Sequence, residues 1–361
     1  MELNDLRESL SDIDRQLVEL IARRQEIVAT IGKHKQSSGR ATRDYQREKD
    51  VLDMARIQAE DLNVDPDLAE DVMRTLIRSS LASQEKDRVV AEGKGDGRSA
   101  LVIGGVGKMG GWFVDFFRSQ GYKTDIADTR LSDGPGEFCD WATAGVGYDV
   151  IVVATPLAVS GDILKALAKM RPRGLVFDIG SLKTPLREGL DALLQSGCKV
   201  ASLHPMYGPD TELLSGRHLI FIDVGSAAAT ADAKELFAPT MVEQLDMGLD
   251  DHDRLIAYVL GLSHALNIAF FTALAESGEA APKLATMSST TFDAQLLVSA
   301  AVAQDNPHLY FEIQSLNDFG LGPLEALCES TERIRDLVAS GDESGFVQLM
   351  TAGREYMALR R

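Results

Sequence analysis

The feature that most constrains the fold of this chain is a long helical stripe near its N-terminus. Apolar residues recur at spacings of three and four from Leu3 to Ile31, and no proline interrupts residues 2–36. A helix of about 34 residues would be about 50 Å long. It would protrude from a domain of this size, so its apolar stripe needs a second chain to cover it. A helical dimer is the simplest arrangement.

The rest of the chain divides by its pattern. Further helices are predicted over 42–60 and from Asp65-Pro66 to about 84, because Asp suits a cap and Pro the first turn. The polar, glycine-containing segment 85–99 is interpreted as a linker. Short β-rich runs then alternate with helices, which predicts a mostly parallel sheet. The runs are 100–103, 123–127, 150–154, 175–179, 200–203 and 219–222.

From about residue 250 the chain is predicted to be helical to its end. The predicted fold is an all-α three-helix domain over 1–90, a linker over 91–98, an α/β Rossmann-type domain over 99–248 and an all-α C-terminal domain over 249–361. We expect the last domain to serve substrate binding and dimerisation, since its long apolar faces suggest a second dimer contact.

Composition excludes several classes of partner. The formal charge of −18 would repel nucleic acid and anionic membranes, so anionic substrates must meet local clusters of Arg and Lys. Cys139, Cys198 and Cys328 lack metal-like or redox-like spacing. The N-terminus does not resemble a signal peptide, and no stretch approaches the roughly 18 apolar residues of a membrane helix. We therefore expect a cytoplasmic protein without a metal.

One arginine interrupts the apolar stripe of the long helix. Arg24 continues the three-four repeat, and a buried guanidinium costs several kcal/mol unless an anion meets it. Alternatively, its stem packs at the rim while its head reaches water. More polar residues line the same three helices, on faces that the spacing brings together: Arg7, Lys35, Asp44, Arg47, Glu48, Ser80 and Gln84.

In order and spacing, these residues resemble the three-helix AroQ class of chorismate mutases over residues 1–90. The resemblance implies that two chains exchange their long helices and that each site borrows Arg7 from the partner. It assigns Arg7, Arg24 and Arg47 to the carboxylates of chorismate, Lys35 and Gln84 to its ether oxygen, and Glu48 with Asp44 to its ring hydroxyl. Ser80 belongs to the same implied substrate site.

The rearrangement of chorismate to prephenate is pericyclic, so it needs positioning and charge stabilisation but no nucleophile or metal. An alternative of another class keeps the helical domain as a non-catalytic sensing and dimerisation module.

A glycine-rich turn follows the first predicted strand. Gly105, Gly107 and Gly110 form G-x-G-x-x-G before an amphipathic helix, and Asp128 ends the next strand about 20 residues later. This pattern predicts a dinucleotide site, with Gly105 for the tight turn, Gly107 for the pyrophosphate and Gly110 for helix packing. Asp128 should bind the ribose hydroxyls and favour NAD over NADP, a preference that Arg130 would soften. Further predicted cofactor contacts are Lys108, Met109, Thr155 and Pro156.

A histidine lies where a sheet of this kind places its chemistry. His204 is predicted just after the strand 200–203, in the loop Leu-His-Pro-Met-Tyr-Gly-Pro-Asp. A lone histidine is more often structural, but this loop resembles that of prephenate dehydrogenases. Other matches continue in family order over 99–361, with the mutase in front as in the bifunctional members. They are Asp178-Ile-Gly-Ser181-Leu-Lys183, Asp251-His252-Asp253, His264, Ser288-Ser289, Ala303-Gln304-Asp305 and Leu309-Tyr310.

The second resemblance implies an NAD-dependent oxidative decarboxylation of prephenate to 4-hydroxyphenylpyruvate, a step toward tyrosine. Neutral His204 would take the ring hydroxyl proton as hydride leaves for NAD⁺, so activity should fall as pH drops through its pKa. Lys183 and Ser181 would line the cleft, and His264 and Tyr310 would contact substrate.

One departure leaves the substrate open. The family places an arginine where this chain has Ala301, and an earlier basic position is Asp293. Either another cation binds the carboxylate or the ring substrate differs. Prephenate is the main prediction and 4-amino-4-deoxyprephenate, formed from the amino analogue of chorismate, is the alternative. A β-hydroxyacid dehydrogenase of related architecture would leave the histidine loop unexplained.

Overall fold

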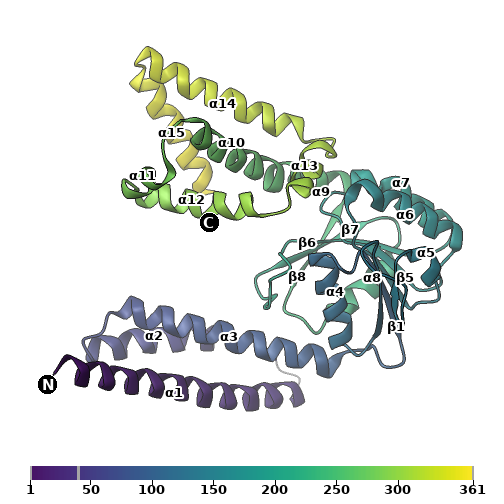
Figure 1. Ribbon diagram of the computed structural model, residues 1–361, viewed down its shortest axis with the longest axis horizontal. Coiled ribbons are helices and arrows are strands. Elements are labelled where there is room, and N and C mark those ends of the chain that lie inside the picture. The colour runs from purple at the N-terminus through teal and green to yellow at the C-terminus, as the bar shows by residue number, and fades with distance from the viewer. Residues whose placement is uncertain (1, 39–40, 360–361) are drawn as a thin grey trace.

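The computed structural model describes residues 2–38 and 41–359. A three-helix bundle, a sheet flanked by helices and a second helical region follow one another along the chain (Figure 1). This order confirms the predicted succession of an all-α, an α/β and an all-α part.

The first bundle consists of α1 (Leu3–Ser37), α2 (Tyr45–Asp61) and α3 (Pro66–Glu92). Asp44 caps α2 and Asp65 caps α3, each by accepting a backbone N–H at 3.0 Å, and Pro66 begins α3 as predicted. No residue of α1 is buried within the chain, and Leu6 and Leu10 are 46% and 59% exposed. The apolar stripe of this helix is therefore uncovered in a single chain.

Helix α3 is longer than predicted. It continues to Glu92, eight residues beyond the expected end near Gln84, so the predicted linker starting at 91 begins inside a helix. The cause is tertiary, because Glu85 and Val89 in the extra turns are buried. The carboxylate of Glu85 accepts N–H bonds from Leu214, at 2.7 Å, and from Met241, both in the next domain.

The central sheet has eight strands in the order β3-β2-β1-β4-β5-β6-β7-β8. All neighbours are parallel except β6 and β7. The six predicted strands are confirmed, whereas β3 and the polar, largely exposed edge strand β8 were not predicted. The strands are β1 (Ser99–Ile103), β2 (Lys123–Ala127), β3 (Glu137–Phe138), β4 (Val150–Val153), β5 (Leu175–Asp178), β6 (Lys199–Pro205), β7 (His218–Asp223) and β8 (Glu243–Gly248).

Helices cover both faces of the sheet. On one face α4 (Lys108–Ser119) and α8 (Ala227–Leu236) bury an aromatic cluster that includes Phe113, Phe117 and Phe177. On the other, α6 (Leu157–Met170) and α7 (Arg187–Gln195) pack leucines against β1, β4 and β5. The short α5 (Trp141–Ala144) and the 3₁₀ turn η1 (Thr184–Leu186) complete this layer. The central strands are buried on both sides, as expected for a parallel sheet.

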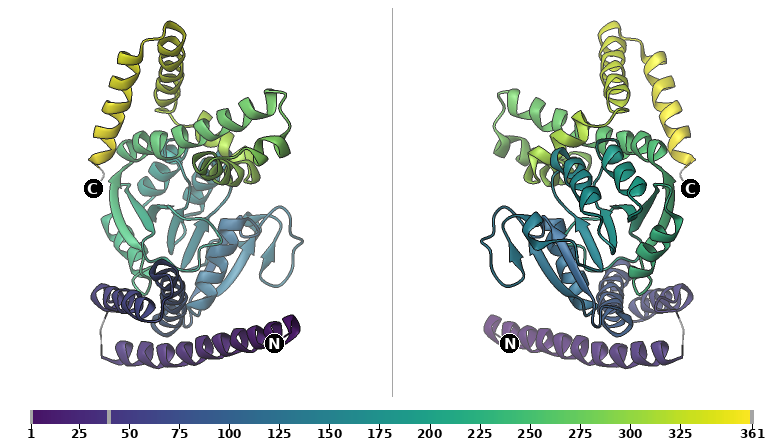
Figure 2. Two further views of the ribbon diagram at one scale, coloured as in Figure 1. Left: turned by 90° about the vertical axis from the view of Figure 1, so that its left-hand side faces the viewer. Right: turned by 90° about the vertical axis from the view of Figure 1, so that its right-hand side faces the viewer.

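The C-terminal region begins with one continuous helix, formed by α9 (Leu249–Ile256), a π-helical segment η2 (Ala257–Leu262) and α10 (Ser263–Glu276). Five helices follow, and Figure 2 shows the last two extending away from the sheet as a pair. They are α11 (Ala281–Thr286), α12 (Thr290–Gln304), α13 (Pro307–Ser315), α14 (Leu321–Ser340) and α15 (Glu343–Ala358).

The expectation that no stretch is apolar enough for a membrane helix is wrong. The helix Leu249–Glu276 contains an 18-residue window of mean hydropathy 1.6, of which 22% is buried. Its polar residues, such as Ser263, His264 and Asn267, are too few to offset the apolar residues around them. Length and composition alone are weak support for a membrane span, because helices of apolar interfaces meet the same criteria.

Candidate active sites

His204 belongs to the sheet rather than to a loop. It is the penultimate residue of β6 and pairs with Ile220 of β7, because the antiparallel neighbour extends the strand beyond its predicted end at 203. The side chain is 4% exposed and lies near the carboxyl end of β6, next to the end of β5. This is the edge at which parallel sheets build their sites.

A chain of hydrogen bonds runs from His204 into the C-terminal helices. His204 Nδ1 lies 2.8 Å from Nε2 of His252, and His252 Nδ1 lies 2.7 Å from Oδ1 of Asp253. Because the carboxylate only accepts, His252 donates from Nδ1 and accepts at Nε2, and His204 must donate from Nδ1. The network therefore leaves a lone pair on His204 Nε2, as a general base requires.

Asp253 anchors this chain. Its side chain is fully buried, and its carboxylate also accepts N–H bonds from Lys183 and Thr184 and the hydroxyl of Thr184. Burial acts to raise the pKa of Asp253, but these hydrogen bonds outweigh it and the net shift is downward. The carboxylate is therefore ionised and holds His252 in place.

Both histidines are kept neutral. Burial first, then the repulsion that a proton on His204 would meet from the neighbouring His252 and Lys183, lower the pKa of His204 well below 6.5. Burial also lowers the pKa of His252, against the opposing effect of Asp253. His204 is therefore in its proton-accepting form at neutral pH.

Lys183 does not line the cleft as predicted. Its side chain is fully buried, and Nζ bonds Asp178 Oδ1 at 2.6 Å and the carbonyl of Leu203 at 2.7 Å. The ammonium thus joins the ends of β5 and β6 and supports the backbone beside His204. Ser181 is better placed to meet a ligand, because its buried Oγ has no partner among residues 2–38 and 41–359.

His264 and Tyr310 are brought together. Their rings contact each other at a tilt of 37°, with centroids 4.1 Å apart, and burial lowers the pKa of His264 and raises that of Tyr310. His264 lies on the same continuous helix as His252, roughly 18 Å further along by helical rise. The pair is therefore a second polar cluster in the C-terminal helices, separate from the hydrogen bonds that join His204, His252 and Asp253.

The glycine-rich turn after β1 has the expected shape with a different residue at its tightest point. Gly104 has φ +88°, which favours glycine. Gly105, predicted to allow the turn, instead packs against Ile126, whose Cγ2 would lie 2.6 Å from a Cβ at this position. A Cβ at Gly110 would lie 2.2 Å from the carbonyl oxygen of Gly104, so this glycine packs α4 against the turn as predicted. Gly107 caps α4 and Lys108 and Met109 open it, so the helix N-terminus faces the turn.

Asp128 follows β2 at the same edge. Its carboxylate accepts two bonds from the Arg130 guanidinium at 2.9 Å and one from the Val106 N–H at 3.2 Å. The Arg130 bond lowers the pKa of Asp128, so a charged acceptor lies beside the turn, already engaged by Arg130.

Thr155 and Pro156 follow β4 beside the α6 N-terminus. Two N–H groups of that terminus, of Leu157 and Ala158, already donate to Glu312 of α13 at 3.1 Å. The C-terminal helices therefore contact the cofactor edge of the sheet next to these two predicted cofactor contacts.

In the helical bundle, α1 and α3 bring several predicted residues together. Arg24 donates to Ser80 Oγ at 2.6 Å and to the Leu76 carbonyl, and burial lowers its pKa. Gln84 donates to the Val28 carbonyl at 3.2 Å, and its buried Oε1 has no partner in the described part of the chain.

Lys35 reaches the same region from the end of α1. Its Nζ donates to the Thr42 carbonyl at 2.8 Å, and Lys35 and Gln84 both line a cavity of about 100 Å³. A Cβ at Gly32 would lie 3.1 Å from Gln84 Cγ, so the glycine lets the two helices approach.

The other predicted mutase residues remain apart in one chain. Arg7 and Arg47 are exposed, and Asp44 serves as the cap of α2. Glu48 is held by Arg43 through two bonds of 2.9 Å. Arg43 was not among the predicted site residues, and it also donates to Ser215 of the sheet domain at 2.6 Å.

The unusual position Ala301 is exposed on α12. Asp293, in the first turn of that helix, is exposed and accepts a bond from Ser288. The structure thus gives Asp293 a local role at a helix start.

Family models match three successive parts of the chain. They describe chorismate mutase type II over residues 6–85, the nucleotide-binding domain of prephenate dehydrogenase over 139–242 and its dimerization domain over 249–352. The second match begins after the glycine-rich turn, so the geometry of that turn is an independent observation.

Relatives agree with this succession. A T-protein of Enterobacter agglomerans is 27% identical over 347 residues, 96% of this chain and 90% of that protein. A 4-amino-4-deoxyprephenate dehydrogenase of Streptomyces pristinaespiralis is 28% identical and covers 69% of this chain and 88% of its own length.

Among solved structures, the fold is similar to prephenate dehydrogenase from Aquifex aeolicus, in complex with hydroxyphenyl propionate and NAD⁺. The TM-score is 0.54 at 18% identity, and the match covers 73% of this chain and 98% of that one. The fold, the order of the three matched domains and the near full-length T-protein relative lead to one conclusion. The chain belongs to the bifunctional family in which a chorismate mutase is fused to a prephenate dehydrogenase.

Proposed function

We propose that the chain rearranges chorismate to prephenate and then oxidises prephenate to 4-hydroxyphenylpyruvate and CO₂, in tyrosine biosynthesis. The observation that carries the second activity is the buried chain His204–His252–Asp253 at the carboxyl end of β6. The first is supported by the polar groups where α1 approaches α3: Arg24 donates to Ser80, and Lys35 and Gln84 line one cavity.

In the mutase, the rate enhancement would come from side chains that position chorismate and stabilise the charge of its transition state. Arg24 would meet a carboxylate, and Lys35 and Gln84, which line one cavity, would donate to the ether oxygen as negative charge develops there. Glu48 would accept from the ring hydroxyl while Arg43 holds it. Arg47 of the same chain and Arg7 of a partner chain would bind the substrate carboxylates when two chains associate; neither lines the cavity in the single chain.

In the dehydrogenase, His204 Nε2 would accept the proton of the C4 hydroxyl as the C4–H bond breaks. The resulting imidazolium would donate from Nδ1 to His252, whose own N–H remains on Asp253, so the buried carboxylate stabilises the new charge. Loss of CO₂ from C1 then makes the ring aromatic. Ser181, with its free Oγ, would bind at the cleft, and His264 and Tyr310 would bind the far end of the substrate.

The residues after β1 fit NAD. A side chain at Gly110 would fill the turn, Gly107 leaves the α4 N-terminus open, and Asp128 supplies a charged acceptor for ribose hydroxyls. Lys108, Met109, Thr155 and Pro156 would contact the same cofactor. Bound NAD⁺ supplies the hydride acceptor for the oxidation.

A second candidate substrate is 4-amino-4-deoxyprephenate. Ala301 removes the cation that the family uses for a carboxylate, and one relative carries the amino substrate in its name. NADH formation with both substrates, measured side by side, decides between them. We expect kcat/KM to favour prephenate, and a tenfold preference for the amine would overturn that assignment.

We also propose a cytoplasmic homodimer that binds neither nucleic acid nor membranes. The exposed stripe of α1 and the dimerization-domain match support two contacts between the same chains. Cys139, Cys198 and Cys328 are free, which suits a reducing compartment. Loss of chorismate absorbance without NAD tests the alternative of a non-catalytic mutase module, which predicts no loss at any protein concentration.

A further inference from the structure

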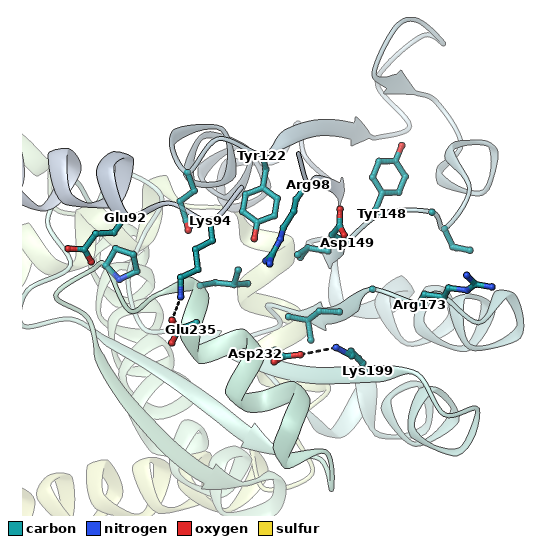
Figure 3. A pocket seen from close by; sticks show the side chains of 18 of the residues that line it. Glu92, Lys94, Arg98, Tyr122, Tyr148, Asp149, Arg173, Lys199, Asp232 and Glu235 are labelled. Atoms are coloured by element: carbon teal, nitrogen blue, oxygen red, sulfur yellow. Dashed lines mark hydrogen bonds and ion pairs between the residues drawn. The ribbon is translucent and has the colours of Figure 1, made fainter. Parts of the chain in front are cut away.

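A large pocket lies at the edge of the sheet opposite the proposed active site. Its volume is about 930 Å³, and its walls come from the amino ends of β1, β4, β5 and β6, the end of α3 and the segment that joins the two domains (Figure 3). Lys199, at its wall, is the first residue of β6, roughly 16 Å along the strand from His204. The pocket is therefore separate from the substrate and cofactor positions.

The free groups around this pocket are hydrogen-bond donors. Gln120 and Tyr122 are each 4% exposed, and neither Gln120 Nε2 nor Tyr122 Oη has a partner among the residues that the structure describes. Figure 3 shows Tyr122 and Arg98 pointing toward the same space. Buried donors without acceptors are costly, and a ligand that brings acceptors removes that cost.

The charged groups that line the pocket also favour an anion. Lys94 pairs with Glu235, and Lys199 pairs with Asp232 at 3.1 Å. Arg98, Arg171 and Arg173 also line the pocket and form no ion pair within residues 2–38 and 41–359, and Asp149 is the one lining carboxylate without an ion pair there. In a chain of net charge −18, three unpaired guanidiniums against one unpaired carboxylate form a local exception that favours anions.

Backbone strain marks the same place. Arg171 has φ +52°, a left-handed conformation that costs a non-glycine residue about 1–2 kcal/mol. It ends α6 and places a guanidinium at the rim, where a glycine would relieve the strain but lose the charge.

The pocket also contacts the mutase. Glu92, the last residue of α3, lines this pocket and the cavity that contains Lys35 and Gln84, and it pairs with Arg88 at 3.0 Å. A ligand here would therefore touch the helix that carries Gln84, two turns away.

We propose that this pocket is an effector site for a small oxyanion bearing several carboxylate or phosphate oxygens, and that its occupancy changes the mutase activity. Guanidiniums bind both kinds of oxygen in the same fork geometry. The unpaired donors Gln120 and Tyr122 select an acceptor-rich ligand over chloride.

The test is titration calorimetry of the full chain with citrate, with inorganic phosphate and with chloride at equal ionic strength. The wild type should bind citrate or phosphate but not chloride, and the better ligand identifies the source of the oxygens. Arg98→Gln should weaken that binding about 10- to 100-fold through loss of a charge-assisted bond. The matched control is Arg118→Gln, an exposed arginine outside the pocket lining, which should bind as the wild type does.

Tyr122→Phe keeps the ring and removes only the unpaired hydroxyl. It should leave the thermal midpoint of the free chain unchanged or higher and weaken anion binding about tenfold. In the mutase assay the bound anion should change the KM for chorismate at least twofold in the wild type and in Arg118→Gln, but not in Arg98→Gln. Equal binding by Arg98→Gln and wild type, an equal response to chloride, or binding without a change in mutase KM would overturn the proposal.

Discussion

Replacing Asp253 by Asn tests the chain of hydrogen bonds behind His204. The substitution keeps the size of the side chain and removes its charge, and Asp253 cannot touch substrate because it is fully buried. A loss of kcat at unchanged KM would therefore pass through His252, whereas the bonds from Lys183 and Thr184 hold the loop that follows Ser181. The two links in that path are 2.7 Å and 2.8 Å long.

The size of the effect follows from the geometry. With the width of one imidazole between the two links, the Asp253 carboxylate lies roughly 8 Å from the charge that develops on His204. At an effective dielectric constant of about 20 this attraction is about 2 kcal/mol. Loss of that energy from the transition state lowers kcat about 30-fold. It also lowers the pKa of His204 further, so the acid limb of the rate profile moves to lower pH.

The assay is NADH formation from prephenate across pH, with chorismate loss as an internal check that the chain is folded. We expect a fall in kcat, a KM for prephenate within about twofold of the wild type, and an unchanged mutase rate. Asp251→Asn is the matched control, since Asp251 lies on the same helix, is exposed and pairs with Arg254. It should behave as the wild type.

A normal kcat in Asp253→Asn would refute the role of the hydrogen-bonded chain. A change confined to KM would refute it as well, because it would point to the loop held by Lys183 and Thr184 rather than to His204.

Three further predictions follow from other parts of the molecule. The folded-state pKa values of His204 and His252 lie below 6.5, so the unfolded chain binds more protons and the free energy of unfolding decreases as pH falls below 6.5. Urea unfolding at pH 7.5 and 5.5 measures this decrease. Equal stability at the two pH values would contradict it. Gly110→Ala should abolish NADH formation, since the new Cβ would lie 2.2 Å from a backbone oxygen, whereas Gly111→Ala, with 3.7 Å, should retain it; equal activities would be inconsistent with the turn described. Glu85→Gln should destabilise the chain by about 1–3 kcal/mol in urea, because its amide replaces one of the acceptors that meet two backbone N–H groups, and an unchanged midpoint would argue against this domain contact.

Local patterns predicted the elements of the fold well. The three-four repeat gives α1 within a residue at each end, and the β-branched runs give the six predicted strands, because both signals arise within a few residues of chain. The extra turns of α3 were missed because Glu85 and Val89 are stabilised by a domain that begins later in the sequence. The polar edge strand β8 shows no apolar run to mark it.

The candidate site could be predicted only in part, because its main contacts join residues that are distant in the sequence. His204 could be selected because an unusual loop surrounds it, but its partner His252 is 48 residues away and no spacing connects the two. The Asp-His-Asp motif resembled the family, but its role became clear only when the fold placed His252 and Asp253 behind His204. Conversely, Lys183 carries a charge suited to a ligand, and only the packing shows that Asp178 and Leu203 bind it instead.

The central claim is that one chain carries out two consecutive reactions at separate sites. Its most direct test is NADH formation from chorismate and NAD⁺, compared between the wild type and His204→Asn. We expect NADH to form after a lag in the wild type, as prephenate accumulates. In His204→Asn, chorismate should disappear at the wild-type rate while NADH formation stops. Normal NADH formation by this variant, or loss of both reactions from a variant that remains folded, would contradict the account.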